Sequence, residues 1–448
     1  METKTRLLFD RKYLFKLIFP LLIEQVLAVM IGMADTVMVA RVGEASVSAV
    51  ALVDSVNILI FQIFAALATG GAVICSQYLG RKDIESAQTA ARQLVLITVC
   101  IGIVLTLVLL PLNRIILNLL FGHVEESVMS QAVHYFILSL LSYPFLGLYN
   151  AGAALFRSMG NSRVSMRVSL LMNVINVGGN AVLIFGCGWG VVGAGTASLF
   201  SRIIAAVVIL SLLFFKPYDL QVRHLFRNGF HPAMIRRILG VGIPAGVEGG
   251  LFQAGKLVVQ RFVTLFGTAA IAANAVANTL ATISNIPGMA ISLAIITVVG
   301  QCMGAEEYGQ AARYTWRLLG VVAFLNGLIC LCLYLFAVPL ADVFHLRPEA
   351  AGLAVSLLRV FSVFSIVFWP PAFALPNALR AAGDVRLTMT VSIISMFLFR
   401  IGLCFFFYRF TDAGVMGIWY AMFVDWICRS TVFLLRFISG KWKNIKVV

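Results

Sequence analysis

The chain has 448 residues, of which 61% are hydrophobic and only 12% are charged, about half the charged share of an ordinary soluble protein. With a mean hydropathy of +0.97, this composition excludes a soluble globular protein. It predicts an all-α integral membrane protein, because irregular backbone cannot face lipid. The formal net charge of +15 would suggest a nucleic-acid partner only in a soluble protein.

Largely apolar runs recur along the chain, and each is long enough to cross a bilayer as a helix. In chain order they predict twelve spans, at residues 15–39, 47–72, 89–111, 127–153, 166–186, 190–214, 238–264, 270–298, 315–339, 350–376, 387–408 and 414–435. The longest polar break, residues 215–237, is too short to fold alone. The sequence therefore predicts twelve transmembrane helices and no soluble domain.

Basic residues are distributed unevenly between the two ends of these spans. If both termini are cytoplasmic, 24 Lys and Arg residues fall at cytoplasmic ends and loops, and four fall outside, namely Arg41, Arg114, Arg347 and Arg409. By the positive-inside rule, this bias predicts cytoplasmic termini in a multi-pass protein of the plasma (inner) membrane. Topology then accounts for the net charge, and we expect no nucleic-acid partner.

A repeat divides the chain into two halves. When the sequence is shifted by half its length, so that Pro20 falls on Pro244, several other polar and conformationally special positions coincide without a gap. They are Glu24 with Glu248, Gly43 with Gly267, Gln77 with Gln301, and Gly80 with Gly304. Each half holds six spans, so both halves enter the membrane in the same sense, as in parallel-repeat transporters. We predict an N-lobe at 1–214, a basic cytoplasmic linker at 215–237 and a C-lobe at 238–448.

Five stretches carry a resemblance to a known family. They are "FPLLIEQVLAVMIGMADTVMVARVG", "GGAVICSQYLGRKD", "ALFRSMGNSR", "NVINVGGNAVLIFGCGWGVVGAGTAS" and "ALRAAGD". In this order, with twelve spans and a half-chain repeat, they resemble the multidrug and toxic compound extrusion (MATE) transporters. The resemblance implies two six-helix lobes in a V and export of organic, often cationic compounds against an H⁺ or Na⁺ gradient.

Eleven ionisable residues fall inside the predicted spans. They are Glu24, Asp35, Asp54, Glu248 and Asp425, with Arg202, Lys256, Arg261, Arg359, Arg400 and Arg429. An unpaired charge near the bilayer centre costs about 2.5–3.5 kcal/mol, so we expect many of them to be paired. Asp425 and Arg429, four residues apart on one helical face, fit an ion pair. Glu248 and Lys256, two turns apart on one face, are a second candidate pair.

Asp35 differs from the other acids in its depth and in its expected neighbours. It lies six residues from the outer end of the first span, about 9 Å at 1.5 Å per residue. Asn176 and Asn180, which share one stripe of the fifth span, reach a similar level. Ser198 of the sixth span and Asp54 of the second span are expected at that level too.

These side chains suit a coupling ion. Arg202 is expected deeper in the membrane, so no basic residue of the first half joins Asp35. Burial favours the protonated form of a carboxylate, and carboxylate, amide and hydroxyl oxygens are hard ligands that suit Na⁺. The sequence therefore predicts H⁺ or Na⁺ coupling at Asp35, with Na⁺ as the only candidate metal and no other cofactor.

The resemblance points to the same residues. In many MATE proteins an acid of the first span couples transport to ion flow together with polar residues of spans five and six, which implies this role for Asp35, Asn176, Asn180 and Ser198. Asn180 stands where relatives often have Asp, and Ser198 where Thr is common. One branch places a Glu in span seven and an Asp in span ten. Those positions hold Gln253 and Trp369 here, which argues against a cation site in the second lobe.

The remaining polar residues of the spans form a second candidate group, whose role is either structural or in contact with the substrate. Its members are Glu24, Gln253, Glu248, Lys256, Arg400 and Asp425.

Catalysis finds no support, since the chain has no P-loop, no H-E-x-x-H and no nucleophile elbow. We predict a secondary active antiporter that exports small organic compounds by alternating access and works as a monomer in the lipid bilayer. The alternative is a flippase for a lipid-linked saccharide, a related protein class with a strongly cationic cavity. Arg202, Arg359 and Arg400 keep that alternative open.

Overall fold

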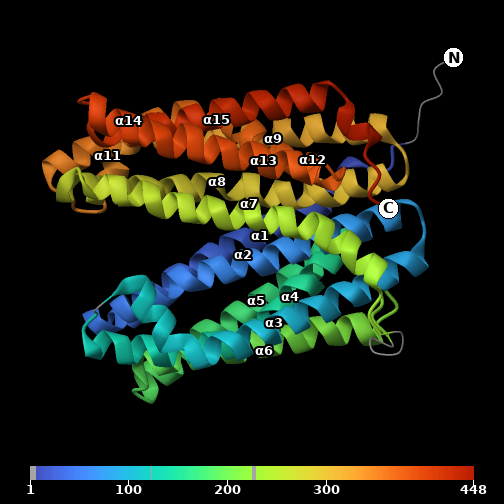
Figure 1. Ribbon diagram of the computed structural model, residues 1–448, viewed down its shortest axis with the longest axis horizontal. Coiled ribbons are helices and arrows are strands. Elements are labelled where there is room, and N and C mark those ends of the chain that lie inside the picture. Colours follow the sequence, from blue (N-terminus) through green and yellow to red (C-terminus); the bar gives the residue numbers. More distant parts are fainter. Residues whose placement is uncertain (1–6, 123, 224–228) are drawn as a thin grey trace. The chain divides into compact units, whose positions relative to one another are not determined.

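The computed structural model describes residues 7–122, 124–223 and 229–448 (Figure 1). Every regular element within these ranges is a helix. Long helices are the expected solution for an apolar chain, because a helix satisfies all its backbone hydrogen bonds within one segment where no water is available.

The first six spans are almost uninterrupted helices. They are α1 (Arg11–Ala40), α2 (Glu44–Gly80), α3 (Ile84–Phe121), α4 (Glu126–Ser158), α5 (Ser162–Asn180) with the π-helical turn η1 (Ala181–Gly186), and α6 (Gly190–Phe215).

The next six spans are more often broken by short irregular turns. They are α7 (Pro232–Thr264), α8 (Gly267–Gly304), α9 (Tyr308–Leu335) with the short α10 (Ala337–Asp342), α11 (Pro348–Trp369) with η2 (Pro370–Ala374) and α12 (Leu375–Ala381), α13 (Val385–Ser395) with η3 (Met396–Ile401) and α14 (Gly402–Phe410), and α15 (Gly414–Ile438). A 3-10 turn, η4 (Lys441–Asn444), follows.

The twelve predicted spans are confirmed as helical segments of the described chain, with one boundary error. The ninth was predicted to reach residue 339, but α9 ends at Leu335 and α10 starts a new helix. Among the described residues, ten helices are long and apolar enough to cross a membrane by length and hydropathy alone, and α7 and α15 are not among them. Most helices extend beyond the predicted apolar ranges, because a helix continues into the interface after its apolar stretch ends.

Local sequence sets where several helices begin. The carboxylate of Asp83 caps α3 by accepting a hydrogen bond from the Ser86 backbone N–H at 3.0 Å. Hydrogen bonds from Ser86 hold the pKa of Asp83 below its ordinary value. Gly43 and Gly267, which coincide in the repeat, lie at the starts of α2 and α8, as the N-cap and the first residue respectively, with φ of +144° and +85°. Glycine adopts such angles without steric cost, so the repeat preserved the turn as well as the helices.

The chain divides into two compact units. The first unit is Arg11–Gly246, and the second unit is Val247–Val448 together with the N-terminal segment that ends at Asp10. The boundary between the units falls inside α7. The lobes predicted at 1–214 and 238–448, joined by 215–237, stay a prediction.

In the first unit, α3 and α4 pack closely around a proline. Pro144 of α4 has no backbone N–H, so the carbonyl of Leu140 loses its helical partner. Thr106 of α3 donates to that carbonyl at 2.7 Å. Gly102 lets the helices approach, since a Cβ there would lie 2.7 Å from Cα of Pro144. Because Gly102 is small, α3 lies close enough to α4 for Thr106 to replace the hydrogen bond that the Leu140 carbonyl has lost.

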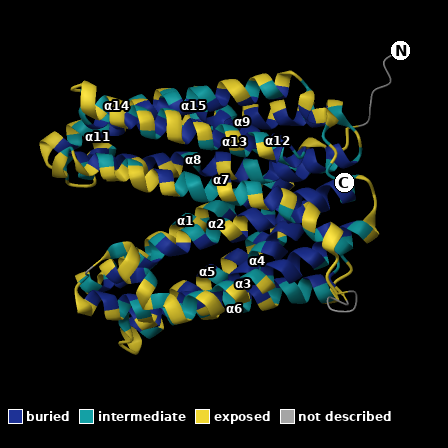
Figure 2. Ribbon diagram, in the orientation of Figure 1, coloured by how far each residue is buried: buried dark blue, intermediate teal, exposed yellow. Residues whose placement is uncertain are grey.

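The second unit has an aromatic core. Phe361 of α11 meets Trp419 and Trp426 of α15 edge to face, with ring centroids 6.0 and 5.9 Å apart. Phe364 stacks on Phe423 at 4.4 Å. Large apolar side chains such as Leu119 and Phe215 are instead exposed on the outer helix faces, and Figure 2 shows exposed residues along the outsides of the helices. This distribution fits a protein whose outer surface contacts lipid.

We predict that Gly102→Ala destabilises the protein by about 1–3 kcal/mol, the usual cost of overpacking, because backbone atoms of Pro144 cannot move aside. The readout is the midpoint of thermal unfolding of the purified protein in lipid nanodiscs. Gly240→Ala in α7 is the matched control, since nothing lies within 4 Å of a Cβ at that position. An equal midpoint for the two variants would contradict close packing at Gly102.

Candidate functional site

The predicted coupling residues of three helices meet in the first unit. Asn180, fully buried at the end of α5, donates from Nδ2 to Oδ1 of Asp35 on α1 at 2.5 Å. The same Nδ2 lies 3.5 Å from Oδ1 of Asn176. Asn176 in turn donates from Nδ2 to the Ser198 hydroxyl of α6 at 3.0 Å. We call Asp35, Asn176, Asn180 and Ser198 the acid–amide cluster.

The turn η1 begins directly after Asn180. A π-helical turn shifts the backbone hydrogen bonds from i→i+4 to i→i+5, and such turns are frequent at functional sites. The cluster therefore lies where the backbone of the fifth span departs from regular α-helix.

Asp54 does not join this cluster by a hydrogen bond among the described residues. Its Oδ1 accepts from Asn57 at 3.1 Å on the same helix, and Oδ1 of Asn57 accepts from the Tyr143 hydroxyl at 2.8 Å. Asp54 thus belongs to a neighbouring network between α2 and α4.

The expectation that Arg202 lies too deep to matter is wrong. Arg202 is within electrostatic range of both Asp35 and Asp54. Its guanidinium donates to the Ser142 hydroxyl at 2.6 Å and lies 5.2 Å from the ring centre of Phe61. It forms no ion pair with either acid in the described chain. A long arginine side chain reaches well beyond its own turn of the helix.

The acid–amide cluster contains one acceptor that is not hydrogen-bonded. Oδ1 of Asn180 is buried and has no hydrogen-bond partner in the structure. An unsatisfied buried acceptor costs about 1–3 kcal/mol, so its presence beside a carboxylate calls for a donor or a cation. A proton on Asp35, or a Na⁺ ion shared by the two side chains, would satisfy it. No group of three or more His, Cys, Asp and Glu side chains suited to a transition metal exists among the described residues.

Glu24 and Glu248, which coincide in the repeat, form equivalent ion pairs in the two units. Glu24 of α1 pairs with Arg157 of α4 at 3.0 Å, and Glu248 of α7 pairs with Arg380 of α12 at 2.7 Å. Both acids are buried. The pairing of Glu248 with Lys256 is therefore wrong. Eight residues along a helix correspond to about 12 Å, whereas Arg380 reaches Glu248 from a neighbouring helix.

Asp425 lies at the centre of a network in the second unit, and its predicted ion pair is confirmed. Arg429 donates from Nε to Oδ1 of Asp425 at 2.8 Å, and the hydroxyl of Ser395 donates to the same oxygen. Nη1 of Arg400 is 3.8 Å from Oδ2. Asp425 is fully buried, so its charge faces protein groups, although Oδ2 accepts no hydrogen bond from the described residues.

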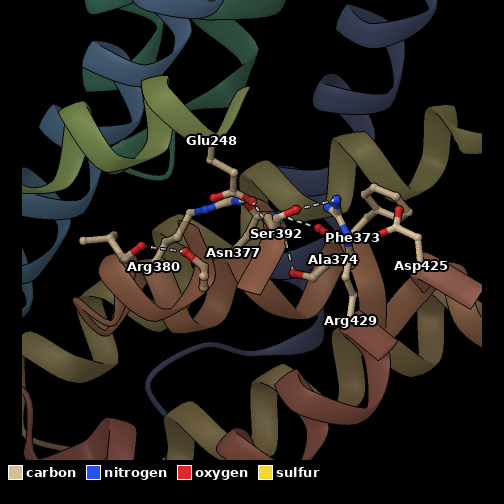
Figure 3. Close-up of polar contacts among 10 residues, drawn as sticks. Glu248, Phe373, Ala374, Asn377, Arg380, Ser392, Asp425 and Arg429 are labelled. Atoms are coloured by element: carbon tan, nitrogen blue, oxygen red, sulfur yellow. Dashed lines mark hydrogen bonds and ion pairs between the residues drawn. The ribbon is translucent and has the colours of Figure 1, made fainter. Parts of the chain in front are cut away.

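Ser392 of α13 joins this network to Glu248 (Figure 3). Its hydroxyl donates to Oε1 of Glu248 at 2.6 Å, and its carbonyl accepts from Nη2 of Arg429 at 3.0 Å. Glu248, Arg400 and Asp425 are therefore brought together as the sequence suggested, through a serine that sequence reasoning missed.

Gln253 and Trp369 do not contribute charge to this network. Gln253 is half-buried and makes no side-chain hydrogen bond within the described residues. Trp369 is buried and stacks on Phe373 at 5.5 Å, and its ring occupies the space beside Gly288 of α8.

Sequence reasoning missed Arg157 and Arg380 as partners, although a signal was present. The motifs "FRSMGNSR" and "LRAAGDVR" match when the shift of the repeat is shortened by one position, and this match places the two arginines opposite each other. Two acids and two arginines that repeat together predict repeated ion pairs. The ring of Phe252, whose centre lies 5.2 Å from the guanidinium of Arg429, carried no comparable signal, because an apolar residue does not stand out in an apolar span.

Two sets of six helices related by a sequence repeat, with polar clusters inside the spanning segments, define a multi-pass helical membrane transporter. The family model MatE matches residues 20–182 and again 244–406, two ranges that begin at the coincident prolines of the repeat, Pro20 and Pro244. The chain therefore belongs to the MatE family, the multidrug and toxic compound extrusion transporters, and the predicted repeat is confirmed.

Relatives match over nearly the full chain. One is the "Probable multidrug resistance protein NorM" of Thermotoga maritima, 29% identical over 98% of this chain and 94% of its own length. Another is the "Uncharacterized transporter YisQ" of Bacillus subtilis, 25% identical over 96% of this chain and 94% of its own length.

Solved structures share the fold. A MATE protein in a bent conformation superposes with a TM-score of 0.89 at 21% identity, covering 96% of this chain and 95% of its own. A MOP superfamily transporter from Pyrococcus furiosus, described as having a binding pocket of reverse polarity, superposes with a TM-score of 0.90 at 20% identity, covering 97% of both chains. The all-helical fold of the family is thus established for this chain.

We predict that Glu248→Gln destabilises the protein by about 3–5 kcal/mol, because it leaves Arg380 buried without its counter-charge. The readout is again thermal unfolding in nanodiscs. The matched control is Glu126→Gln, which breaks the Arg114–Glu126 pair of the same 2.7 Å length but with side chains 58% and 73% exposed, where a pair contributes about 0–1 kcal/mol.

The double variant Glu248→Gln/Arg380→Gln should recover part of the loss, since it removes both charges. If Glu248→Gln and Glu126→Gln had the same effect, the Glu248–Arg380 pair would not stabilise the second unit.

Proposed function

We propose that the chain is a secondary active antiporter that exports small organic, often cationic and amphipathic compounds in exchange for H⁺ or Na⁺. The acid–amide cluster is the observation that carries this proposal. The names of the curated relatives, which speak of multidrug resistance, support export of diverse compounds. The protein works in the plasma membrane, with both termini in the cytoplasm, as a monomer and without a nucleic-acid partner or a catalytic step.

The chemistry of coupling follows from the side chains of the cluster. Ionised Asp35 accepts the hydrogen bond from Nδ2 of Asn180 and so connects α1 to α5. Protonated Asp35 becomes a donor, and the unpartnered Oδ1 of Asn180 is an acceptor for it. Na⁺ would instead draw both oxygens toward itself. Either ion changes the bonding between α1 and α5. A conformation of the protein that favours the ion-bound pattern therefore takes up the ion, and a conformation that favours the ion-free pattern releases it.

The other polar residues have supporting roles in this proposal. Asp54 and Arg202 adjust the local charge at the cluster, since both are within electrostatic range of Asp35. Glu24 and Glu248 hold their helices through buried ion pairs at equivalent places of the repeat.

The second candidate function is a flippase for a lipid-linked saccharide. It is favoured by the guanidinium and ammonium groups of the second unit, because a pyrophosphate group would need such cations. The acid–amide cluster has no evident role in that reaction, so antiport is the better-supported function.

The test is transport by purified protein in liposomes with a pH gradient and a Na⁺ gradient imposed separately. We expect one of the two gradients to drive export of a fluorescent organic cation. Asp35→Asn should abolish gradient-driven export while the protein still inserts, because asparagine neither releases a proton nor carries the charge that attracts Na⁺.

Asp412→Asn is the matched control, since Asp412 is exposed outside the helices, and it should export at the normal rate. Export by Asp35→Asn at the rate of the control under both gradients would rule out the coupling role. Movement of a lipid-linked oligosaccharide in the same liposomes, without export of the cation, would favour the flippase.

A further inference from the structure

The second unit contains an open cavity of about 290 Å³ between α7, α8, η3 and α15. Lys256, Asn278, Arg400 and Trp419 are among its lining residues. Lys256 and Asn278 are exposed to it, while Arg400 and Trp419 are buried in its wall. The cavity thus opens at the protein surface and has a cationic and an aromatic side.

The cavity occupies the place in the repeat that corresponds to the coupling residues of the first unit. When Pro20 is placed on Pro244, four of the five predicted coupling positions fall on residues that line it, while Asn180 falls on Cys404, which does not. The matches are Asp35 with Val259, Asp54 with Asn278, Asn176 with Arg400, and Ser198 with Met422. The shorter shift that places Arg157 on Arg380 in the preceding motif puts Arg400 opposite Val177, the neighbour of Asn176. In the second unit, neutral side chains therefore stand in place of Asp35 and Asp54. The guanidinium of Arg400 stands at or beside the position of the Asn176 amide.

Positive charge exceeds negative charge around the cavity. Lys256, Arg400 and Arg429 all approach the ring of Phe252, at 5.7, 5.5 and 5.2 Å from its centre. Among the described residues, Asp425 is the only carboxylate that forms an ion pair with any of these three cations. A charge excess inside membrane-spanning helices is expensive, and such residues commonly mark a substrate path.

The two cations that line the cavity are incompletely satisfied. Arg400 is only 7% exposed, yet its Nε has no hydrogen-bond partner among the described residues. Its closest approach to Asp425 is 3.8 Å, beyond hydrogen-bond distance. Lys256 has no acidic partner among the described residues and is within electrostatic range of Arg400. A bound anion would satisfy both groups and remove their mutual repulsion.

Hydrogen bonds hold the other polar side chains of the cavity wall, and apolar side chains complete it. Trp419 donates from Nε1 to Oδ1 of Asn274 at 3.0 Å, and Asn274 donates from Nδ2 to Gln260 at 3.2 Å. Ile418 and Met422 add apolar surface. A ligand that combines a negative group with an aromatic or aliphatic body matches these walls better than a simple inorganic ion.

We propose that this cavity binds the carboxylate, sulfonate or phosphate group of an amphipathic organic anion through Lys256 and Arg400. Binding itself requires no ion gradient. Its role as a substrate site rests on the transport function proposed above, and it widens the substrate class to compounds that carry a negative group.

The test is isothermal titration of the purified full chain, in nanodiscs of zwitterionic phosphatidylcholine, with naphthalene-2-sulfonate. The wild type should bind this anion, and Lys256→Gln should weaken binding about tenfold or more, the loss of one charge-assisted hydrogen bond. Lys256→Arg should retain binding. Arg400→Gln should weaken it too, and if that variant fails to fold, the exposed Lys256 still decides the question.

Arg359→Gln is the matched control, because it removes one cation from α11 of the same unit without lining the cavity. Its side chain lies 5.8 Å from the ring centre of Tyr334. Equal binding by Lys256→Gln and Arg359→Gln would overturn the proposal. Binding of 2-naphthylmethylammonium with the same dependence on Lys256 would overturn it as well.

Two further measurements distinguish a lipid headgroup from a soluble anion, and distinguish a failure of this proposal from a failure of the proposed coupling role. If phosphatidylglycerol in the nanodisc competes with the sulfonate and Lys256→Gln removes the competition, the physiological ligand is a lipid headgroup. If it does not compete, the ligand is a soluble anion. Asp35→Asn should bind the sulfonate normally although it loses gradient-driven export, so a failure of coupling and a failure of anion binding give different results.

Discussion

The scarcity of water inside a bilayer is the constraint on which the whole structure depends. It requires every backbone amide to be bonded within its own helix, which explains the long helices. Where Pro144 breaks that pattern, Thr106 supplies the missing donor. The same constraint makes each charged side chain costly, so Glu24 and Glu248 are held in ion pairs. Among the polar groups of the described residues that remain unsatisfied, Oδ1 of Asn180 and Nε of Arg400 belong to the two proposed sites.

The repeat separates what the two units need for folding from what distinguishes them. The glutamate–arginine pairs occur at equivalent positions in both units, as do the glycines at the starts of α2 and α8. These features stabilise helix packing, which both units require. The positions equivalent to Asp35 and Asp54 carry Val259 and Asn278 instead, and Arg400 stands at or beside the position of an amide. The units thus share a scaffold and differ in the charge of their polar sites.

This difference in charge gives the two units different chemistry. A carboxylate bonded to a buried amide can exchange a proton or Na⁺, because either ion satisfies acceptors that are already in place. Cations around the ring of Phe252 attract anionic groups, because one carboxylate does not balance them. In our proposals the acid–amide cluster and the anion-binding cavity therefore lie in different units of the duplicated scaffold.

The sequence by itself determined the twelve spans, the half-chain repeat, the Asp425–Arg429 pair and the meeting of Asp35 with the amides of the fifth span. Each of these depends on local periodicity, on the apolar length of a helix, or on depth along its axis, all of which can be counted from the sequence. Only the tertiary structure decided that Glu248 pairs with Arg380 rather than Lys256, that Arg202 comes within range of Asp35, and that Ser392 links two networks. These contacts depend on how each helix is rotated about its axis and on how far long side chains reach across to a neighbouring helix, and neither quantity is encoded in the periodicity of a single span.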